Sequence, residues 1–427
     1  MNKSKLSTES YKGVRDFYPE DLFIQNHIFN TWRRVVEKFG YVEYSASVLE
    51  PAELYSAKSG EEIVNEQTYT FTDRGGRSVT LRPEMTPTVA RMVAQKQHDL
   101  TFPLRWYSIP NLFRYEKPQR GRLREHWQLN VDIFGADSSN ADIEIITIAY
   151  QIMKNFGAKD GDFVIKVNNR KIIDELYKKF KLDEEKSYKV SKIIDKKNKI
   201  SPETFEGALT EIMGDSAKEL INLLASDEKL LESLGENNEN VKELISLIEK
   251  LADKGMNNIE FDPTLMRGFD YYTDTVFEVN DLHPDNNRSI FGGGRYDELL
   301  DIFGARKMPT VGFGAGDVTM KDFLETHGLL PKYRGPTDLY ICITDIKHVK
   351  EATSLADVLR EKALNVAVDL SGKKLGDQLK IASKQAIPYV ICIGEDEIKS
   401  GLYKVKNMET GEETKVKMEE VVNVIKK

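Results

Sequence analysis

Cysteine and long apolar segments are scarce in this sequence. Its 427 residues include two cysteines, Cys342 and Cys392, and each lies within a short apolar run. Two thiols cannot form a disulfide framework, so we expect core thiols in a reducing compartment. No stretch approaches the roughly 20 apolar residues of a membrane-spanning helix. The polar start MNKSKLSTES also lacks the apolar segment of a secretory signal. We therefore expect a cytoplasmic protein without membrane attachment.

An excess of basic charge is missing as well. The chain has 61 Lys and Arg against 69 Asp and Glu, a formal net charge of −8. This balance excludes a uniformly basic nucleic-acid-binding surface but permits a local basic site. The 6 histidines show no metal-ligand spacing, and no serine or cysteine lies in a nucleophile-elbow context. We expect neither a bound metal nor a serine or cysteine nucleophile.

Composition divides the chain into segments, because 427 residues exceed what a single core usually holds. Two β-rich segments flank a segment rich in lysine, glutamate and leucine, whose periodicity predicts a helical insertion. After a Pro/Gly linker, strands and helices alternate, which predicts an α/β domain with parallel strands. The expected segments are 1–168, 169–256, 257–328 and 335–427.

Local patterns in the first segment predict particular elements. Apolar residues at helical spacing predict a helix over 21–39, ended by Gly40, and an extended segment that ends at Pro51. Residues 69–81 have the pattern of a β-hairpin with a turn at 73–76. Thr86-Pro87 is typical of a helix start, with the hydroxyl as cap.

A strand with two unlike faces is predicted over residues 123–133. Residues of one parity are mainly apolar: Leu123, Trp127, Leu129, Val131 and Ile133. Those of the other parity are polar: Arg124, His126, Gln128, Asn130 and Asp132. Because side chains alternate across a strand, one face carries hydrogen-bonding groups. Such a face could line a substrate cleft, although a solvated face would have the same pattern.

Four short segments could carry chemistry. The first, FRYEKPQRGR (113–122), holds arginines that could bind phosphate oxygens in pairs, or could form a solvated hairpin tip. In LRPEMT (81–86), Glu84 and Thr86 could bind a ligand or cap a helix. RGFDYY (267–272) leads into a strand, and FGGGRYD (291–297) could be a ligand site or a site of close strand packing.

Together these segments resemble the histidyl-tRNA synthetase family of class II aminoacyl-tRNA synthetases, over nearly the whole chain. Helix 21–39 with the strand ending at Pro51 resembles motif 1, the dimer-forming element. FRYEKPQRGRLREHWQ (113–128) resembles motif 2, and LRPEMT and RGFDYYTDTVFE resemble histidine-specific segments. The resemblance implies an α+β fold. Its parts would be an antiparallel-sheet catalytic core, a helical insertion and a C-terminal α/β anticodon-binding domain.

The implied activity is ATP-dependent ligation of L-histidine to tRNA(His) through a histidyl-adenylate. The resemblance implies a homodimer that uses ATP with Mg²⁺ as a substrate complex and holds no tightly bound cofactor. In-line displacement at phosphorus requires mainly positioning and positive charge from the protein.

The implied site residues follow position by position. The implied catalytic residues, at the α-phosphate, are Arg114 and Arg267. ATP would contact Arg114, Glu116, Arg122 and Arg267. Histidine would contact Glu84, Met85, Thr86, Arg114, Gln128, Asp132, Arg267, Tyr271 and Tyr272. The tRNA acceptor end would meet Lys117, Gln119 and Arg120.

Three positions depart from the family pattern. Thr319 stands where motif 3 normally has an arginine, so Arg122 or Arg295 would have to compensate or ATP binding would be weaker. Asp132 replaces a glutamate, and Lys117 replaces an arginine of the motif 2 loop.

Three alternative functions compete with this one. The main one is the non-catalytic regulatory subunit of ATP phosphoribosyltransferase, which usually lacks the terminal domain and the RGFDYY-type segment. Another class II synthetase with the same terminal domain would not explain RGFDYY and LRPEMT. A plain RNA-binding module would not need Arg114, Glu116 and Arg267.

The first prediction concerns Arg267. Arg267→Ala is expected to reduce histidine-dependent exchange of pyrophosphate into ATP by orders of magnitude and to leave histidine binding largely intact. The reason is that the side chain is assigned to the α-phosphate, where charge develops. Exchange close to wild type would show that this assignment is wrong.

Overall fold

The computed structural model describes residues 6–56, 67–197, 200–235, 237–266 and 271–426. They divide into two compact units. One comprises the described parts of Met1–Asp16 and Gln25–Leu330, and the other those of Phe17–Ile24 and Pro331–Lys427. Across these ranges, no helix combines the length and apolar character needed to cross a bilayer.

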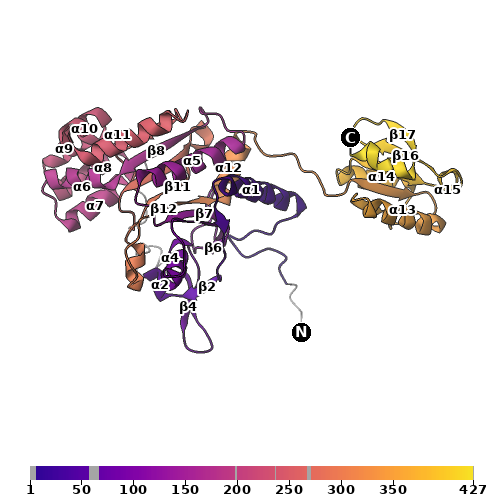
Figure 1. Ribbon diagram of the computed structural model, residues 1–427, viewed down its shortest axis with the longest axis horizontal. Helices are drawn as coiled ribbons and strands as arrows, with labels where there is room; N and C mark the ends of the chain where they lie inside the picture. Colours follow the sequence, from indigo (N-terminus) through magenta and orange to yellow (C-terminus); the bar gives the residue numbers. More distant parts are fainter. Residues whose placement is uncertain (1–5, 57–66, 198–199, 236, 267–270, 427) are drawn as a thin grey trace. The chain divides into compact units, whose positions relative to one another are not determined.

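A large, mainly antiparallel sheet forms the centre of the first unit (Figure 1). Its strands within the described ranges number nine, in the order β1-β5-β7-β12-β11-β10-β8-β9, with β6 paired to β7 beside this path. All pairs from β5 to β8 are antiparallel, and the pairs β1–β5 and β8–β9 are parallel. The strands are β1 Val42–Glu43, β5 Leu104–Ser108, β6 Asn111–Phe113, β7 Glu125–Phe134, β8 Phe163–Asn169, β9 Ile259–Phe261, β10 Thr275–Asp281, β11 Ser289–Arg295 and β12 Thr310–Gly316. The expected antiparallel core is confirmed.

One face of this sheet is apolar and covered by helices. Val131 of β7 pairs with Phe313 of β12, whose ring lies 5.6 Å from Phe291 and 6.1 Å from Phe277. Helices α5 (Ser139–Asn155) and α12 (Asp317–Thr326) pack against these strands. Figure 1 shows both on the same side of the sheet, opposite α4. The alternation predicted for 123–133 is therefore present along β7.

The opposite face is apolar only at one end. There α4 (Thr86–Lys96) and the short 3₁₀ helix η3 (Leu299–Phe303) enclose Phe134 and Val276. Helix α4 has Met85 as its N-cap residue and no side-chain cap, so the predicted hydroxyl cap at Thr86 is wrong. The remainder of this face carries the polar residues of β7.

A long helix and a smaller sheet are formed by residues 19–81. Helix α1 spans Pro19–Lys38, close to the predicted 21–39. The predicted hairpin is confirmed as part of a three-stranded sheet in the order β2-β4-β3. Asp73 closes its turn by accepting hydrogen bonds from the backbone amides of Gly75 and Arg77. The elements are β2 Leu49–Pro51, α2 Glu53–Ser56, β3 Tyr69–Thr72 and β4 Ser78–Leu81.

Consecutive helices follow β8 before the chain returns to the sheet. They are α6 Arg170–Lys179, α7 Glu184–Ile194, α8 Pro202–Met213, α9 Ser216–Leu224, α10 Asp227–Leu234 and α11 Glu239–Ala252. Five of these helices are capped by side chains of the residue types expected there: Asn169, Asp183, Ser201, Ser226 and Asn238.

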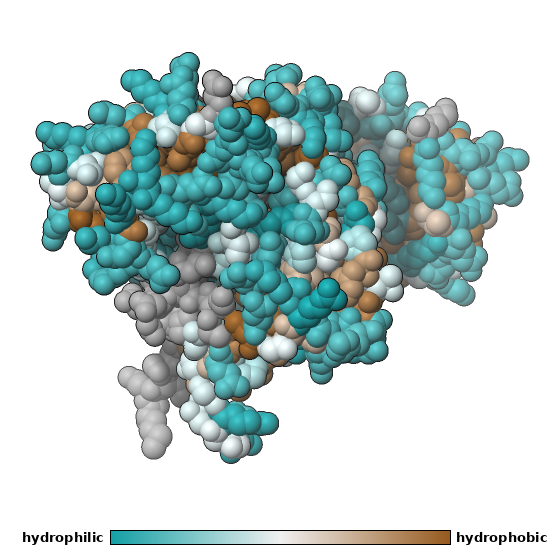
Figure 2. Space-filling model, turned by 60° about the vertical axis from the view of Figure 1, so that its left-hand side comes forward, coloured by the Kyte–Doolittle hydropathy of each residue, from teal (hydrophilic) through white to brown (hydrophobic). Residues whose placement is uncertain are grey.

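Figure 2 shows a mainly hydrophilic surface, with hydrophobic residues in separate patches.

The second unit contains a five-stranded sheet in the order β14-β13-β15-β16-β17. The three predicted strands pair in parallel as expected, and the antiparallel strands β16 and β17 extend the sheet beyond the prediction. Cys342 is fully buried, but its register partner Cys392 is partly exposed, and both are free thiols. The elements are β13 Leu339–Ile343, η4 Ile346–His348, α13 Val349–Glu361, β14 Val366–Val368, α14 Leu375–Lys384, β15 Tyr389–Ile393, α15 Glu395–Ser400, β16 Leu402–Asn407, β17 Glu413–Lys417, η5 Met418–Glu420 and α16 Val421–Ile425.

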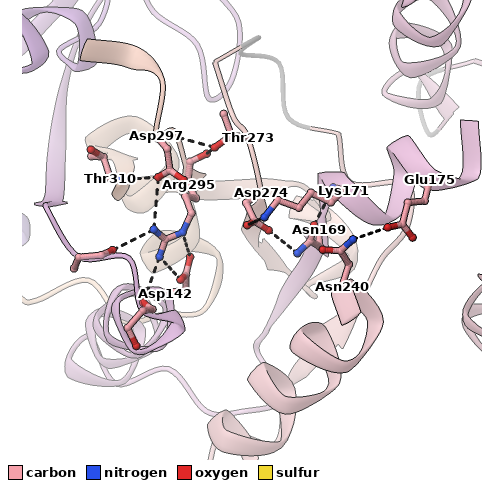
Figure 3. Close-up of polar contacts among 12 residues, drawn as sticks. Asp142, Asn169, Lys171, Glu175, Asn240, Thr273, Asp274, Arg295, Asp297 and Thr310 are labelled. Atoms are coloured by element: carbon pink, nitrogen blue, oxygen red, sulfur yellow. Dashed lines mark hydrogen bonds and ion pairs between the residues drawn. The ribbon is translucent and has the colours of Figure 1, made fainter. Parts of the chain in front are cut away.

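A buried ion pair joins β11 to α5 in the first unit (Figure 3). The Arg295 guanidinium donates to Asp142 from Nη2 at 2.5 Å and from Nε at 3.2 Å. The side chains of Arg295 and Asp142 are only 5% and 4% exposed. A buried carboxylate that loses its cation is left uncompensated, which is costly.

Arg295→Met is therefore expected to destabilise the first unit by about 3–5 kcal/mol. Urea unfolding followed by tryptophan fluorescence measures this, because Trp32, Trp106 and Trp127 all belong to that unit. The control is Arg105→Met, which removes a more exposed pair with Glu144 (34% and 24% exposed). Its expected cost is about 1 kcal/mol or less. Equal destabilisation by the two variants would contradict the prediction.

Candidate active site

Strand pairing places the polar residues of β7 beside glycines. Gln128, Asn130 and Asp132 pair with Gly316, Gly314 and Gly312 of β12. Gly312 and Gly314 pair in turn with Gly294 and Gly292 of β11. Directly paired residues point to the same face of a sheet, so the polar side chains adjoin a strip without side chains.

The glycines are needed because other side chains lie over them. A Cβ at position 314 would overlap the amide of Gln128, and one at 312 would overlap Asp132 and come 2.7 Å from the hydroxyl of Tyr296. A Cβ at 294 would come 2.9 Å from the ring of Tyr272. The glycines of β12, with Gly294 of the segment 291–297, thus allow close packing and form the floor of a polar site.

Asp132 is buried, with 3% of its surface exposed. Tyr296 donates a hydrogen bond to Oδ1, whereas Oδ2 is buried without a hydrogen-bond partner among the described residues. Burial raises the pKa of the carboxyl to about 7, and the hydrogen bond from Tyr296 opposes this rise. Asp132 therefore changes its charge near neutral pH in the ligand-free chain.

Three tyrosines form a wall next to this carboxylate. The ring of Tyr271 lies 5.0 Å from Tyr272 and 5.6 Å from Tyr296. The hydroxyl of Tyr271 donates to Oε2 of Glu84 at 3.3 Å, and Glu84 is buried. Glu84, Tyr271, Tyr272 and Asp132 thus form one connected group.

Arg114 lies next to this group, just after β6. Its Nε donates to the backbone oxygen of Pro83 at 2.9 Å, directly before Glu84 in sequence. The Phe113 amide donates to the backbone oxygen of Arg82 at 3.0 Å. Met85 is fully buried at the N-terminus of α4, and Thr86 is half-buried. The segment 81–86 and the start of motif 2 are therefore held together.

Arg82 secures this junction from inside. Its buried guanidinium donates to the backbone oxygens of Ala46, Ser47 and Asn111, at distances between 2.8 and 3.2 Å, and also to the side chain of Asn111. All of these bonds are internal to the protein, so Arg82 has a structural role.

The motif 2 loop is exposed. Arg122, with 61% of its side chain exposed, lies 3.5 Å from Glu116. Lys117 and Gln119 are exposed, and Arg120 donates to the hydroxyl of Thr326 at 3.1 Å. These side chains lie at the surface, where a macromolecule could reach them.

Arg267 lies outside the described residues, together with 268–270. The convergence of Arg114 and Arg267 on one phosphate stays a prediction. Tyr271 and Tyr272, from the same segment, are described and lie in the pocket group.

The motif 3 region contains no arginine at position 319. The Thr319 hydroxyl donates to the backbone oxygen of Ile290 at 2.7 Å. Two cations are predicted to replace this arginine. The prediction is wrong for Arg295, because its guanidinium is buried in an ion pair with Asp142. Arg122, which is largely exposed, remains a candidate.

Two residues of this region are absent from the predicted site. Tyr296 could have been found from its place in FGGGRYD, next to the glycines that adjoin β7. His126 was recognised only as part of the polar face of residues 123–133. Burial, Arg114 and Arg15 lower its pKa to about 3, so it is neutral near pH 7.

Comparisons with known proteins bear on this geometry. A family model described as histidyl-tRNA synthetase matches residues 13–317, and one described as anticodon binding domain matches 338–427. The histidine--tRNA ligase of Leptospira biflexa is 43% identical over 100% of this chain and 99% of its own length. The crystal structure of a histidyl-tRNA synthetase from Nostoc has a TM-score of 0.84 at 25% identity, covering 99% of each chain. A Bacillus halodurans structure titled ATP phosphoribosyltransferase regulatory subunit/histidyl-tRNA synthetase has a TM-score of 0.74 at 25% identity, covering 91% of this chain and 99% of its own.

The sheet, the polar site and the second unit define an aminoacyl-tRNA synthetase with an anticodon-binding domain. Within this class, the chain belongs to the histidyl-tRNA synthetase family.

The glycine floor yields a prediction. Gly314→Ala is expected to displace the amide of Gln128, the side chain that a Cβ there would meet. Because this amide ends a flexible side chain, unfolding should change little. The KM for histidine should rise on the order of tenfold through one lost hydrogen bond. Steady-state pyrophosphate exchange measures this.

Gly316→Ala is the matched control on the same strand and face. Its Cβ would meet only the Thr319 hydroxyl, at an ordinary 3.4 Å. Equal effects of the two substitutions on KM would contradict the prediction.

Proposed function

We propose that this chain ligates L-histidine to tRNA(His) at the expense of ATP, through a histidyl-adenylate. One observation carries the proposal: Glu84, Tyr271, Tyr296 and Asp132 form a connected set, and Arg114 is bonded to Pro83, directly before Glu84. It occurs in a chain similar along its whole length to a histidine--tRNA ligase. A cation for phosphate thus adjoins buried acceptors for an amino acid.

In the first step, the histidine carboxylate attacks the α-phosphate of ATP and pyrophosphate leaves. Arg114, with Arg267, contacts the α-phosphate and stabilises the charge that develops on its oxygens. Glu116 accepts a hydrogen bond from the adenine amino group. Arg122 binds the distal phosphates, for which its exposed guanidinium is suited.

Recognition of histidine uses the buried acceptors. Glu84, Thr86, Gln128 and Asp132 hold the amine and the imidazole, Met85 contributes to the pocket, and Tyr271 and Tyr272 close it. A site of buried acceptors discriminates against apolar side chains of similar size, because such a ligand would leave these acceptors unpaired.

In the second step, a hydroxyl of the 3′-terminal ribose of tRNA attacks the carbonyl carbon of the adenylate, and AMP leaves. Lys117, Gln119 and Arg120 contact the acceptor end, where contacts to the backbone position the RNA. The segment 335–427 binds the anticodon end, which the family-model match to 338–427 supports. The segments 1–168 and 257–328 form the catalytic core and 169–256 an insertion within it.

Mg²⁺ enters with ATP as part of the substrate, whose phosphates supply its ligands. We place the protein in the cytoplasm as a homodimer that uses the motif 1 elements, by analogy with the family.

The alternative is a regulatory subunit of ATP phosphoribosyltransferase. The similarity to the Bacillus halodurans structure, whose title names both functions, makes it worth testing. The anticodon-binding segment and the RGFDYY sequence favour the synthetase instead.

Histidine-dependent exchange of labelled pyrophosphate into ATP tests the proposal directly. Wild-type protein should catalyse it, and Arg114→Ala should reduce it by about 10²-fold or more, as for the loss of one transition-state donor. Folded wild-type protein without exchange would favour the regulatory alternative.

Arg360→Ala is the control for Arg114→Ala. The Arg360 guanidinium also donates to a backbone oxygen, that of Val366, at 3.1 and 2.7 Å, but in the other unit. Its exchange rate should equal that of the wild type.

A further inference from the structure

One oxygen of the buried carboxylate Asp132 lacks a partner. Oδ1 accepts from Tyr296, but Oδ2 has no hydrogen bond to any residue that the structure describes. Buried polar atoms in native proteins are almost always paired, and an exception needs a reason. The oxygen lies on the face that carries Gln128, so a bound substrate could satisfy it.

Tyr296 is held firmly against this carboxylate. The side chain is 2% exposed, and its ring packs against Tyr271 at 5.6 Å and Tyr272 at 6.3 Å. Its amide donates to the backbone oxygen of Thr310 at 2.8 Å. Gly312 leaves the space in which the hydroxyl and the carboxylate meet. The phenol therefore has little freedom to move away from Oδ1.

We propose that Tyr296 is a positioning residue that occupies Oδ1 of Asp132 and so directs Oδ2 to accept the ring N–H of the substrate's imidazole. This inference rests on the proposed function and deepens it, since it names what orients the imidazole acceptor. Tyr296 acts through Asp132 and does not take part in the phosphoryl chemistry.

The same arrangement makes histidine binding depend on pH. Burial raises the pKa of Asp132 to about 7, and Tyr296 counteracts part of this rise. The carboxylate also interacts with the phenols of Tyr44 and Tyr41 and contributes to raising their pKa values. Glu84, the remaining acid of the group, contacts Tyr271.

The direction of the pH effect follows from the donor. A ring N–H favours the ionised carboxylate, so bound histidine lowers the pKa of Asp132. Histidine affinity should therefore fall as the pH drops through about 7 and level off above it.

The test is calorimetric titration of the full chain with L-histidine between about pH 5.5 and 8.5, spanning the pKa of Asp132. Tyr296→Phe should weaken binding about tenfold at the upper end, through loss of a hydrogen bond to a charged group. The pH range over which histidine affinity falls on acidification should also move to higher pH, because the hydrogen bond that favours the carboxylate is gone. The ligand's own titration is common to all variants and cancels in the comparison.

Tyr107→Phe is the matched control. Tyr107 is fully buried, and its hydroxyl donates to Oε1 of Glu37 at 2.7 Å. It pairs with Val131 and so points to the opposite face of the sheet. Its affinity and pH profile should match those of the wild type. Asp132→Asn should bind histidine weakly, and its affinity should no longer fall as the pH drops through about 7.

The outcomes separate the two hypotheses. Wild-type affinity and profile in Tyr296→Phe would overturn the role of Tyr296 while leaving the proposed function in place. The role of Tyr296 would also be overturned if the wild-type protein bound histidine most tightly below pH 7, as the imidazolium. A folded wild-type chain that binds no histidine at any pH would overturn the proposed function, and this inference with it.

Discussion

The pairing of β7 with β12 is the constraint on which the site depends. Seven residue pairs, from Thr310 with Phe134 to Gly316 with Gln128, fix which side chains share a face. A shift by one residue would turn Gln128, Asn130 and Asp132 toward the apolar side and place Leu129 and Val131 over the glycines. The burial of Val131 against Phe313 opposes such a shift. The hydrophobic side of the sheet therefore determines the position of the polar site on the other side.

Much of this arrangement could be predicted from sequence, because it depends on local alternation. Parity along 123–133 separates the faces of β7, and apolar runs locate β13, β14 and β15. The predictions were less successful where distant segments decide the outcome. The alternation of side chains along β11 did not predict the ion pair between Arg295 and Asp142 of α5. It also did not predict that Tyr296, just beyond the end of the strand, donates a hydrogen bond to Asp132. Strands β16 and β17 were missed because their alternation is weak and their residues are largely exposed or partly buried.

Glycine has a particular use in this sheet. In most strands it weakens packing, because it contributes no side chain. Here the strip on β11 and β12 lets Gln128, Asp132 and Tyr272 lie over the backbone. A buried carboxylate can then have one oxygen paired to protein and one directed to a ligand. Asp132 uses this arrangement, because its Oδ1 accepts from Tyr296.

Arg82 has a consequence for how the pocket comes apart. Its guanidinium joins the backbone at 46–47 to that at 111, while its own backbone joins Phe113. If the backbone at 46–47 or strand β6 detaches, Arg82 loses these partners, and the segment that leads to Glu84 loses an anchor. Local opening here would therefore disturb the binding-competent state. A ligand that prefers the closed form must oppose this opening in proportion to the logarithm of its concentration. The occupied enzyme should therefore resist proteolytic cleavage in this region better than the empty one.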